Sequence, residues 1–188
     1  MGQIYLEIDA RLSEWINAQR MFFTATAPEG EGNINCSPKG FQTFRILDAN
    51  TVAYLDLTGS GIETVAHLKE NGRIVIMFCA FEGSPRIVRL NGTGCVLEKA
   101  TSEFNDLIEK FAPLPDEHMV SARAIIKVSV TRIADSCGYG VPLMKYEGER
   151  TQLAAWVQRK GRDGIAQYRQ EKNLRSIDGL TGLDPALR

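Results

Sequence analysis

The sequence has few residues of the kinds that bind metals or carry out hydrolysis. It contains two histidines, His67 and His118, and neither has a neighbour at triad-like or metal-like spacing, so no hydrolytic or metal site is predicted. Its cysteines form no C-x-x-C pair, which argues against a zinc site. They stand at Cys36, Cys79, Cys95 and Cys137. Three lie in apolar strand-like runs, where a thiol packs as a small hydrophobe, and we expect reduced thiols in a cytosolic protein.

The chain also lacks an excess of charge and any long apolar run. Its 22 basic and 23 acidic residues leave a net charge of −1, so neither nucleic acid nor an anionic membrane is an expected partner. No run approaches the roughly 20 apolar residues that span a bilayer. Asp9, Arg11 and Glu14 interrupt the first segment, so we expect no signal peptide and a cytoplasmic location. The 188 residues, 44% of them apolar, suit one domain with a sizeable core.

Alternating apolar residues predict about seven strands and few helices. Strands are expected at residues 21–27, 33–37, 41–47, 51–56, 73–81, 86–97 and 123–134. The nearly continuous apolar run 73–81 predicts a strand buried on both faces, and Gly92 and Gly94 suggest strong coiling or a close backbone approach. Helices are expected at residues 8–18, 62–70 and 102–111, the last started by Thr101 or Ser102. This pattern favours an antiparallel barrel.

The end of the chain differs from this barrel pattern. Residues 136–142 read as a loop, and two polar-faced helices, 152–160 and 164–172, are separated by Gly161. Residues 173–188 show no periodicity, so we expect them to contribute little core. We therefore predict a barrel domain at 1–135 and a C-terminal extension at 136–188, packed on the barrel or on a partner subunit.

A lysine and a glycine-rich turn together predict an anion site. Asn35, Ser37 and Lys39 alternate along one expected strand and so share a face. Thr58-Gly-Ser-Gly then opens a helix, whose N–H groups and dipole could cradle a phosphate. Two simpler interpretations remain open. Lys39 would be a solvated turn residue, and Ser60 with Glu63 would form an ordinary capping box.

The expected elements and motifs follow one another in a fixed order. It runs strand, Ser-Pro-Lys-Gly, strand, Gly-Ser-Gly-x-x-Thr, helix, Asn-Gly-Arg, apolar strand. Over about residues 21–135, this order resembles the pyridoxamine 5'-phosphate oxidase-like family of FMN-binding split barrels. The resemblance implies a mainly β, antiparallel split β-barrel with peripheral helices, here with a helical C-terminal extension. It also implies a homodimer that holds FMN at its interface. Two positions depart from the best-known members: Ile34 stands where they carry arginine, and Thr64-Val65 where they carry Arg-Lys.

The resemblance also implies which residues meet the cofactor. They are Asn35, Ser37, Lys39, Leu55, Asp56, Ser60, Thr64 and Arg89. In relatives, a polar residue on the strand of Arg89 reaches the flavin of the other subunit. The alternative for Arg89 is a salt bridge to Asp56 or Glu63, because an arginine among apolar residues needs a partner.

Three functions stay open from the sequence. The first is an FMN-dependent oxidoreductase acting on an unidentified small molecule. The second is a non-catalytic flavin or haem carrier, with His67 or His118 as the haem ligand, and the third is a deazaflavin-dependent reductase. No catalytic acid, base or nucleophile is predicted. Vitamin B6 oxidation is not expected, because the chain lacks the Arg-Leu-Ala-Pro ending of such enzymes. The aromatic residues of the tail either pack against the barrel core or form a cap over the flavin ring, to which the loop 136–142 would contribute most. They are Tyr139, Tyr146, Trp156 and Tyr168.

Overall fold

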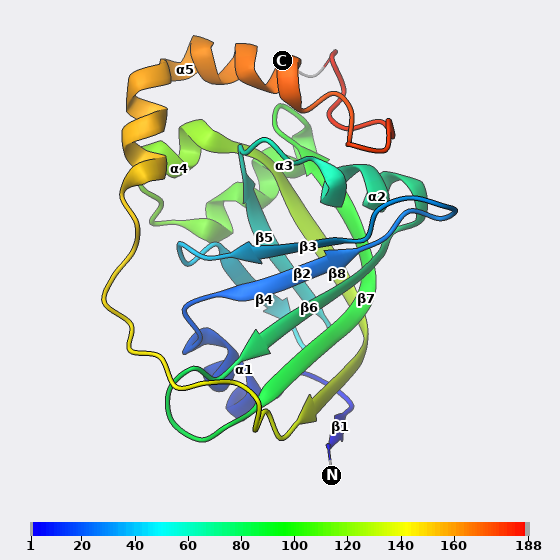
Figure 1. The fold of residues 1–188 in the computed structure, drawn as a ribbon, viewed down its shortest axis with the longest axis vertical. Helices are drawn as coiled ribbons and strands as arrows, with labels where there is room; N and C mark the ends of the chain where they lie inside the picture. The colour runs from blue at the N-terminus through cyan, green and yellow to red at the C-terminus, as the bar shows by residue number, and fades with distance from the viewer. Residues whose placement is uncertain (1, 187–188) are drawn as a thin grey trace.

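The computed structural model describes residues 2–186, in which eight strands form one antiparallel sheet (Figure 1). Their order is β3-β2-β6-β7-β8-β5-β4, with the short β1 paired to β8. The strands are β1 Ile4–Tyr5, β2 Phe22–Thr26, β3 Asn35–Lys39, β4 Phe44–Asp48, β5 Thr51–Leu57, β6 Arg73–Cys79, β7 Ile87–Glu98 and β8 Ala122–Ser136. The sheet curls into a split barrel that is not closed, which confirms the predicted fold class.

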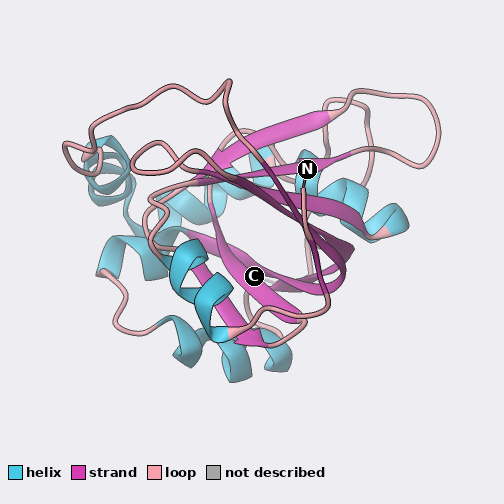
Figure 2. Cartoon of the chain, turned by 90° about the horizontal axis from the view of Figure 1, so that it is seen from below, coloured by secondary structure: helices cyan, strands magenta, loops and turns pink. Residues whose placement is uncertain are grey.

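Helices surround the curled sheet without entering it (Figure 2). They are α1 Ala10–Asn17, α2 Glu63–Asn71, α3 Ser102–Ile108, the 3₁₀ helix η1 Glu109–Phe111, α4 Asp116–Ser121 and α5 Gln152–Lys172. Thr101 caps α3 as predicted, since its side chain accepts a hydrogen bond from the N–H of Phe104. Among the described residues 2–186, no helix is long and apolar enough to cross a membrane.

The barrel core is aromatic at its centre. Phe22 packs edge-on against Phe44 and Tyr54, with ring centroids 5.2 and 5.4 Å apart, and Phe78 joins them. A second, smaller core cluster lies between the sheet and α3, where Phe104 and other apolar side chains are buried. Burial of this apolar surface is the main term that stabilises the fold.

The outer face of the sheet is only half-buried, so two predictions are wrong: that β6 is buried on both faces, and that three cysteines pack as small hydrophobes. Along β6, buried residues alternate with the half-buried Val75 and Met77 within one chain. Cys36 and Cys95 are exposed, and so is Cys137, so Cys79 alone of the four thiols packs as a small hydrophobe. The alternation arises because successive strand side chains point to opposite faces of the sheet.

Gly92 marks a close approach between β7 and β8, as predicted. The register shifts between Asn91 and Gly92, and a Cβ atom on Gly92 would lie 2.3 Å from the carbonyl oxygen of Ser129. Only glycine fits such a contact, which lets the two long strands coil around one another.

The C-terminal segment packs closely on the barrel, so the expectation that residues 173–188 contribute little core is wrong. Figure 1 shows this segment beside α2. Asn173 is fully buried and Leu183 belongs to the main core cluster. A Cβ atom on Gly182 would lie 2.9 Å from a side-chain carbon of Ile62, so the backbone itself is in contact. Residues 187–188 of the segment lie outside the described residues.

Three further elements differ from expectation. β1 and α4 were not predicted, because two and six residues are too few to show a period. α5 includes both expected tail helices, and the predicted break is present as the non-helical Gly161, with φ 65° and ψ 179°.

Candidate functional site

Three charged side chains meet where the edge strand β3 approaches β5. The Nζ atom of Lys39 lies 2.7 Å from one carboxylate oxygen of Asp56, and Nε of Arg123 lies 2.7 Å from the other. Asp56 is fully buried, while 18% of the Lys39 side chain remains exposed. Lys39 is therefore partly buried in an ion pair with Asp56, and the interpretation of Lys39 as a solvated turn residue is wrong.

Burial alone would raise the pKa of Asp56, because it disfavours the charged carboxylate. The charges of Arg123 and Lys39, together with their hydrogen bonds, outweigh burial and lower the pKa to about 2. Asp56 therefore stays ionised at neutral pH and orients both cations.

The guanidinium of Arg123 also holds the glycine-rich turn that precedes α2. Its two terminal nitrogens donate to the carbonyl oxygens of Gly59 and Gly61, at 3.2 and 2.7 Å. Asn173, from the C-terminal segment, donates to the same Gly59 carbonyl at 2.9 Å. These bonds fix the positions of the two glycine carbonyls and so hold the turn against the ion pair.

A second arginine adds positive charge behind this turn. Arg169 of α5 donates to the hydroxyl of Thr58 at 2.8 Å and to the carbonyls of Val120 and Ala122, but to no carboxylate among residues 2–186. Burial first, and the charge of Arg123 second, lower the pKa of Arg169 to about 10, so it remains charged at neutral pH. Two cations thus contact one buried carboxylate and a third lies close to Arg123, so positive charge is in excess here.

The N-terminus of α2 faces this region without a cap. Ile62 precedes the helix, and no side chain accepts a hydrogen bond from its first N–H groups, so the predicted Ser60–Glu63 capping box is wrong. The Glu63 carboxylate instead accepts the N–H of Ile177 at 3.3 Å. Ser60 is exposed. Free N–H groups at a helix start, with the dipole, favour an anion.

A neutral hydrogen-bond network adjoins the charged group. The Asn35 amide donates to the hydroxyls of Thr26 and Thr64, and the Ser37 hydroxyl donates to the Asn35 oxygen at 2.9 Å. Asn35, Ser37 and Lys39 therefore share a face, as predicted. His67 lies beneath this network. Its ring is fully buried with Nδ1 3.0 Å from the Thr26 hydroxyl, and this burial argues against haem ligation by His67.

Two of the eight predicted cofactor residues lie away from the rest. Leu55 is buried in the smaller core cluster, so its side chain meets no ligand. Arg89 is paired in register with Met77, on the outer face of the sheet, and donates to the Ser136 hydroxyl at 3.1 Å. Its predicted salt bridge to Asp56 or Glu63 is wrong. Within one chain, Arg89 and Lys39 are on opposite faces.

Sequence reasoning missed Arg123 and Arg169 as parts of this site. The available signal was Arg123 as a lone charge in the apolar strand run Ala-Arg-Ala-Ile-Ile, where a buried arginine requires partners. Arg169 gave no signal, because a polar-faced helix contains several exposed basic residues.

Comparisons with known proteins agree on one family. The model of a family described as pyridoxamine 5'-phosphate oxidase matches residues 8–137. The pyridoxamine 5'-phosphate oxidase family protein ustO of Aspergillus flavus is 36% identical over 203 residues, covering all of this chain and 80% of the relative.

Two solved structures share the fold at lower identity. HupZ of Group A Streptococcus has a TM-score of 0.52 at 23% identity, over 67% of this chain and 91% of HupZ. A candidate pyridoxamine 5'-phosphate oxidase of Lactobacillus delbrueckii has a TM-score of 0.50 at 16% identity. The match covers 68% of this chain and 93% of the Lactobacillus chain.

Proposed function

Because this chain belongs to the pyridoxamine 5'-phosphate oxidase family, we propose that it is a flavoprotein that binds FMN and oxidises or reduces a small molecule. The observation that carries the proposal is the positive charge behind the uncapped start of α2. The FMN phosphate is an anion of the kind that suits the uncapped N–H groups of this helix start, and the neighbouring Ser60 is exposed.

The residues present fit the phosphate in both charge and exposure. Ser60 and the first N–H groups of α2 would bind the phosphate oxygens directly. Lys39 and Arg123 would act from behind, where Asp56 holds them. The bound flavin would supply the hydride or electron transfer, and the protein its position and electrostatic surroundings.

We extend the proposal to a homodimer in the cytoplasm. Its support is the outer face of β2, β3 and β6, where half-buried or exposed apolar side chains lie in register. They are Phe23, Ala25, Cys36, Val75 and Met77. A second copy on this face would bring its own Arg89 towards the first copy's edge strand, which one chain alone does not do. The face also offers an apolar surface for a flavin ring.

The phosphate assignment predicts that the protein prefers FMN to riboflavin, which lacks the phosphate. Ser60→Ala should weaken FMN binding by about 1 kcal/mol through loss of one hydrogen bond, with riboflavin affinity unchanged. Titration of flavin fluorescence measures both. Ser84→Ala, which removes a hydroxyl from another exposed turn, is the matched control and should change neither affinity. Equal affinities of the parent protein for FMN and riboflavin would contradict the phosphate site.

The dimer is tested on the outer face. Met77→Glu places a charge among apolar neighbours and should convert the protein to monomers at micromolar concentration, as measured by analytical ultracentrifugation. Ile177→Glu makes the same type of change at a side chain that is 73% exposed in the C-terminal segment, and should leave the dimer intact. A folded monomer of the parent protein at that concentration would refute the proposal.

A further inference from the structure

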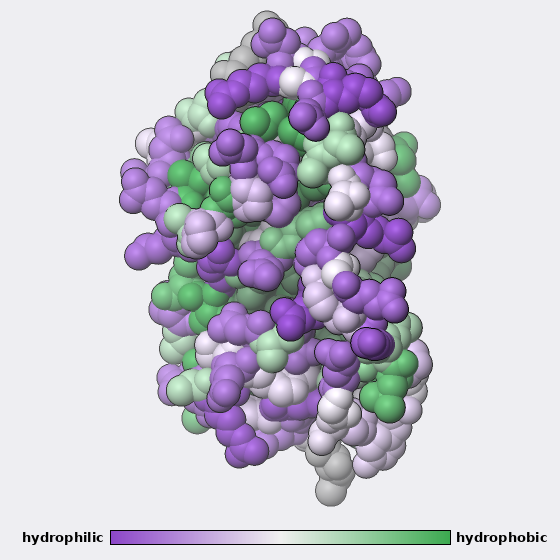
Figure 3. Space-filling view, turned by 90° about the vertical axis from the view of Figure 1, so that its left-hand side faces the viewer, coloured by the Kyte–Doolittle hydropathy of each residue, from purple (hydrophilic) through white to green (hydrophobic). Residues whose placement is uncertain are grey.

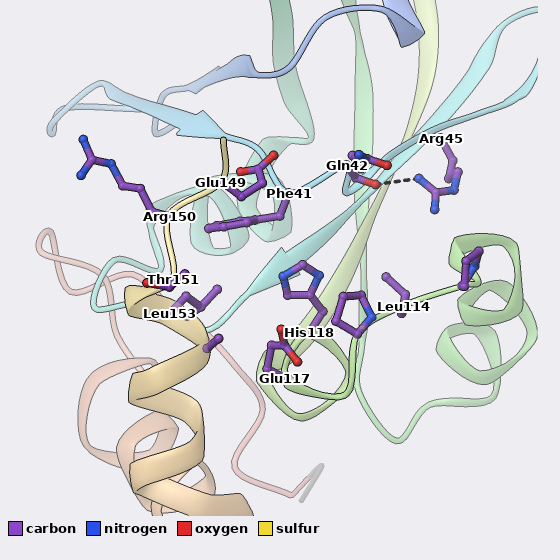
Figure 4. A pocket seen from close by; sticks show the side chains of 13 residues that line it. Phe41, Gln42, Arg45, Leu114, Glu117, His118, Glu149, Arg150, Thr151 and Leu153 are labelled. Carbon is purple, nitrogen blue, oxygen red and sulfur yellow. Dashed lines mark hydrogen bonds between the residues drawn. The ribbon is translucent and has the colours of Figure 1, made fainter. Parts of the chain in front are cut away.

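A cavity of about 370 Å³ is formed by three separate segments (Figure 4). They are the turn that follows Lys39, the segment 113–118 before and within α4, and the first turn of α5. Its size falls within the roughly 300–1,000 Å³ range of small-molecule sites. Figure 3 shows the same side of the molecule, where apolar surface is visible between polar side chains. The C-terminal extension therefore completes a cavity that the barrel alone would leave open.

The turn at the rim is held in an unfavourable conformation. Phe41 and Gln42 have φ values of 59° and 53°, and the turn is closed by the Thr43 N–H, 3.3 Å from the Gly40 carbonyl. Turns with two positive φ values usually contain Asn-Gly, because bulky side chains are strained there. The strained backbone places the Phe41 ring 5.3 Å from the ring of His118, and such strain clusters at binding sites.

His118 provides an unused polar group within the cavity wall. His118 is 8% exposed, and its Nδ1 atom is buried without a hydrogen-bond partner in the described residues. Figure 4 shows the ring in the middle of the lining side chains, with Phe41 on one side and Leu114 on the other. Burial lowers the pKa of His118 against the opposing effects of Glu117 and Glu149, so the neutral ring offers one donor and one acceptor.

The start of α5 provides donors for an anion. Thr151 precedes the helix without a side-chain cap, and within the described part of the chain no acceptor is bound to the N–H groups of Gln152, Leu153 and Ala154. The helix then continues unbroken to Gly161, long enough to carry a dipole. An anion in the cavity would therefore meet three free N–H groups, next to the unpartnered imidazole.

The charged side chains around the cavity leave one carboxylate available. Arg45 lines the wall, but its nitrogens donate to the carbonyls of Gln42, Phe44, Lys110 and Phe111. Arg150 points away from the cavity in Figure 4, and Glu149 interacts with Tyr146. Glu117 is half-buried and forms no ion pair in the described residues. It is the natural partner for a positively charged ligand group.

We propose that this cavity binds a small aromatic zwitterion of the amino-acid type. Its carboxylate would bind the first turn of α5, its ring would lie against Phe41 and the two prolines Pro113 and Pro115, and its ammonium would face Glu117 and His118. The inference goes beyond flavin binding and does not depend on it, since no residue of the proposed phosphate site lines the cavity.

Calorimetric titration with three related probes tests the proposal without any flavin. L-phenylalanine has both charges, 3-phenylpropanoate only the carboxylate, and phenethylamine only the ammonium. We expect phenylalanine to bind at least about tenfold more tightly than either single-charge probe, because both charged contacts contribute. Binding of none of the three, or tighter binding of phenethylamine than of phenylalanine, would overturn the proposal.

Two variants separate the charged contacts. Glu117→Gln should weaken phenylalanine binding about tenfold and leave 3-phenylpropanoate within about twofold, since only phenylalanine has the ammonium. Glu109→Gln makes the same change at an exposed residue of η1 and should alter neither. His118→Phe replaces the imidazole with an apolar aromatic ring, and should weaken phenylalanine binding about fivefold and leave 3-phenylpropanoate within about twofold. Unchanged phenylalanine affinity in Glu117→Gln, with unfolding temperature as the folding check, would contradict the assigned orientation. Unchanged FMN affinity in these variants would show that the two sites are independent.

Discussion

Asp56→Ala is expected to lower the free energy of unfolding by about 3–5 kcal/mol, because it leaves two cations without their shared carboxylate. Arg123 is 4% exposed and cannot reach water to replace the lost partner. Lys39, with 18% of its side chain exposed, can compensate in part. The glycine-rich turn should also loosen, since Asp56 orients the guanidinium that binds Gly59 and Gly61. FMN affinity should fall together with stability.

Urea denaturation of Asp56→Ala and of the control Asp163→Ala, an exposed residue of α5, measures this loss. The effect should depend on pH. The folded-state pKa of Asp56, about 2, lies below its ordinary value of 3.8, so its stabilisation is present above about pH 4 and is lost as pH falls towards 2. The difference corresponds to about 2 kcal/mol. A parent protein whose stability is constant between pH 4 and pH 2 would contradict the assigned pKa.

The double variant Asp56→Leu with Arg123→Met distinguishes charge pairing from simple packing. Apolar side chains of similar volume avoid the desolvation cost of a buried ion pair, so we expect part of the lost stability to return. FMN affinity should not return, because the positive charge behind the turn would still be reduced. Recovery of both properties would mean that Arg123 does not contribute to the anion site.

The strands could be predicted because their signal is local. Alternation of apolar residues identifies β2 to β8 to within a few residues, and Gly92 indicates its own close contact. The ion cluster could not be predicted in the same way. Lys39 and Asp56 are 17 residues apart and Arg123 is 67 residues beyond Asp56, so their meeting depends on the order of the strands. Only the family resemblance placed Lys39 and Asp56 in one site.

Segments without periodicity were the least predictable. The capping box at Ser60 failed because Ile62, two residues later, is the residue that directly precedes α2. Arg123 and Asn173 hold the turn in this arrangement through the Gly59 carbonyl. The cavity beside Phe41 requires the start of α5, which lies more than a hundred residues later in the chain. A sequence pattern reports the face of one element, whereas these features arise where several elements meet.

Ending the chain after Lys172 is expected to lower the free energy of unfolding by at least about 3 kcal/mol. The truncation removes Leu183 from the main core and the buried Asn173, whose side chain donates to the Gly59 carbonyl at 2.9 Å. It also removes the Gly182 carbonyl that accepts a 2.5 Å hydrogen bond from Lys69. FMN affinity should decrease as well, because one of the two donors that hold the Gly59 carbonyl is lost.

A pair of point variants tests whether the core contact or the mere presence of the segment matters. Leu183→Ala should cost about 2–4 kcal/mol, since the side chain is 8% exposed and its removal leaves a cavity. Ile177→Ala, six residues earlier and 73% exposed, should cost less than about 0.5 kcal/mol. Denaturant titration of both variants gives the difference. Equal losses would mean that the segment packs differently from the contact seen at Leu183, whereas a large loss for Leu183 alone identifies the C-terminal extension as part of the barrel core. In that case the barrel and the extension fold as one unit, and the turn proposed to bind phosphate depends on residues far beyond the family pattern that revealed it.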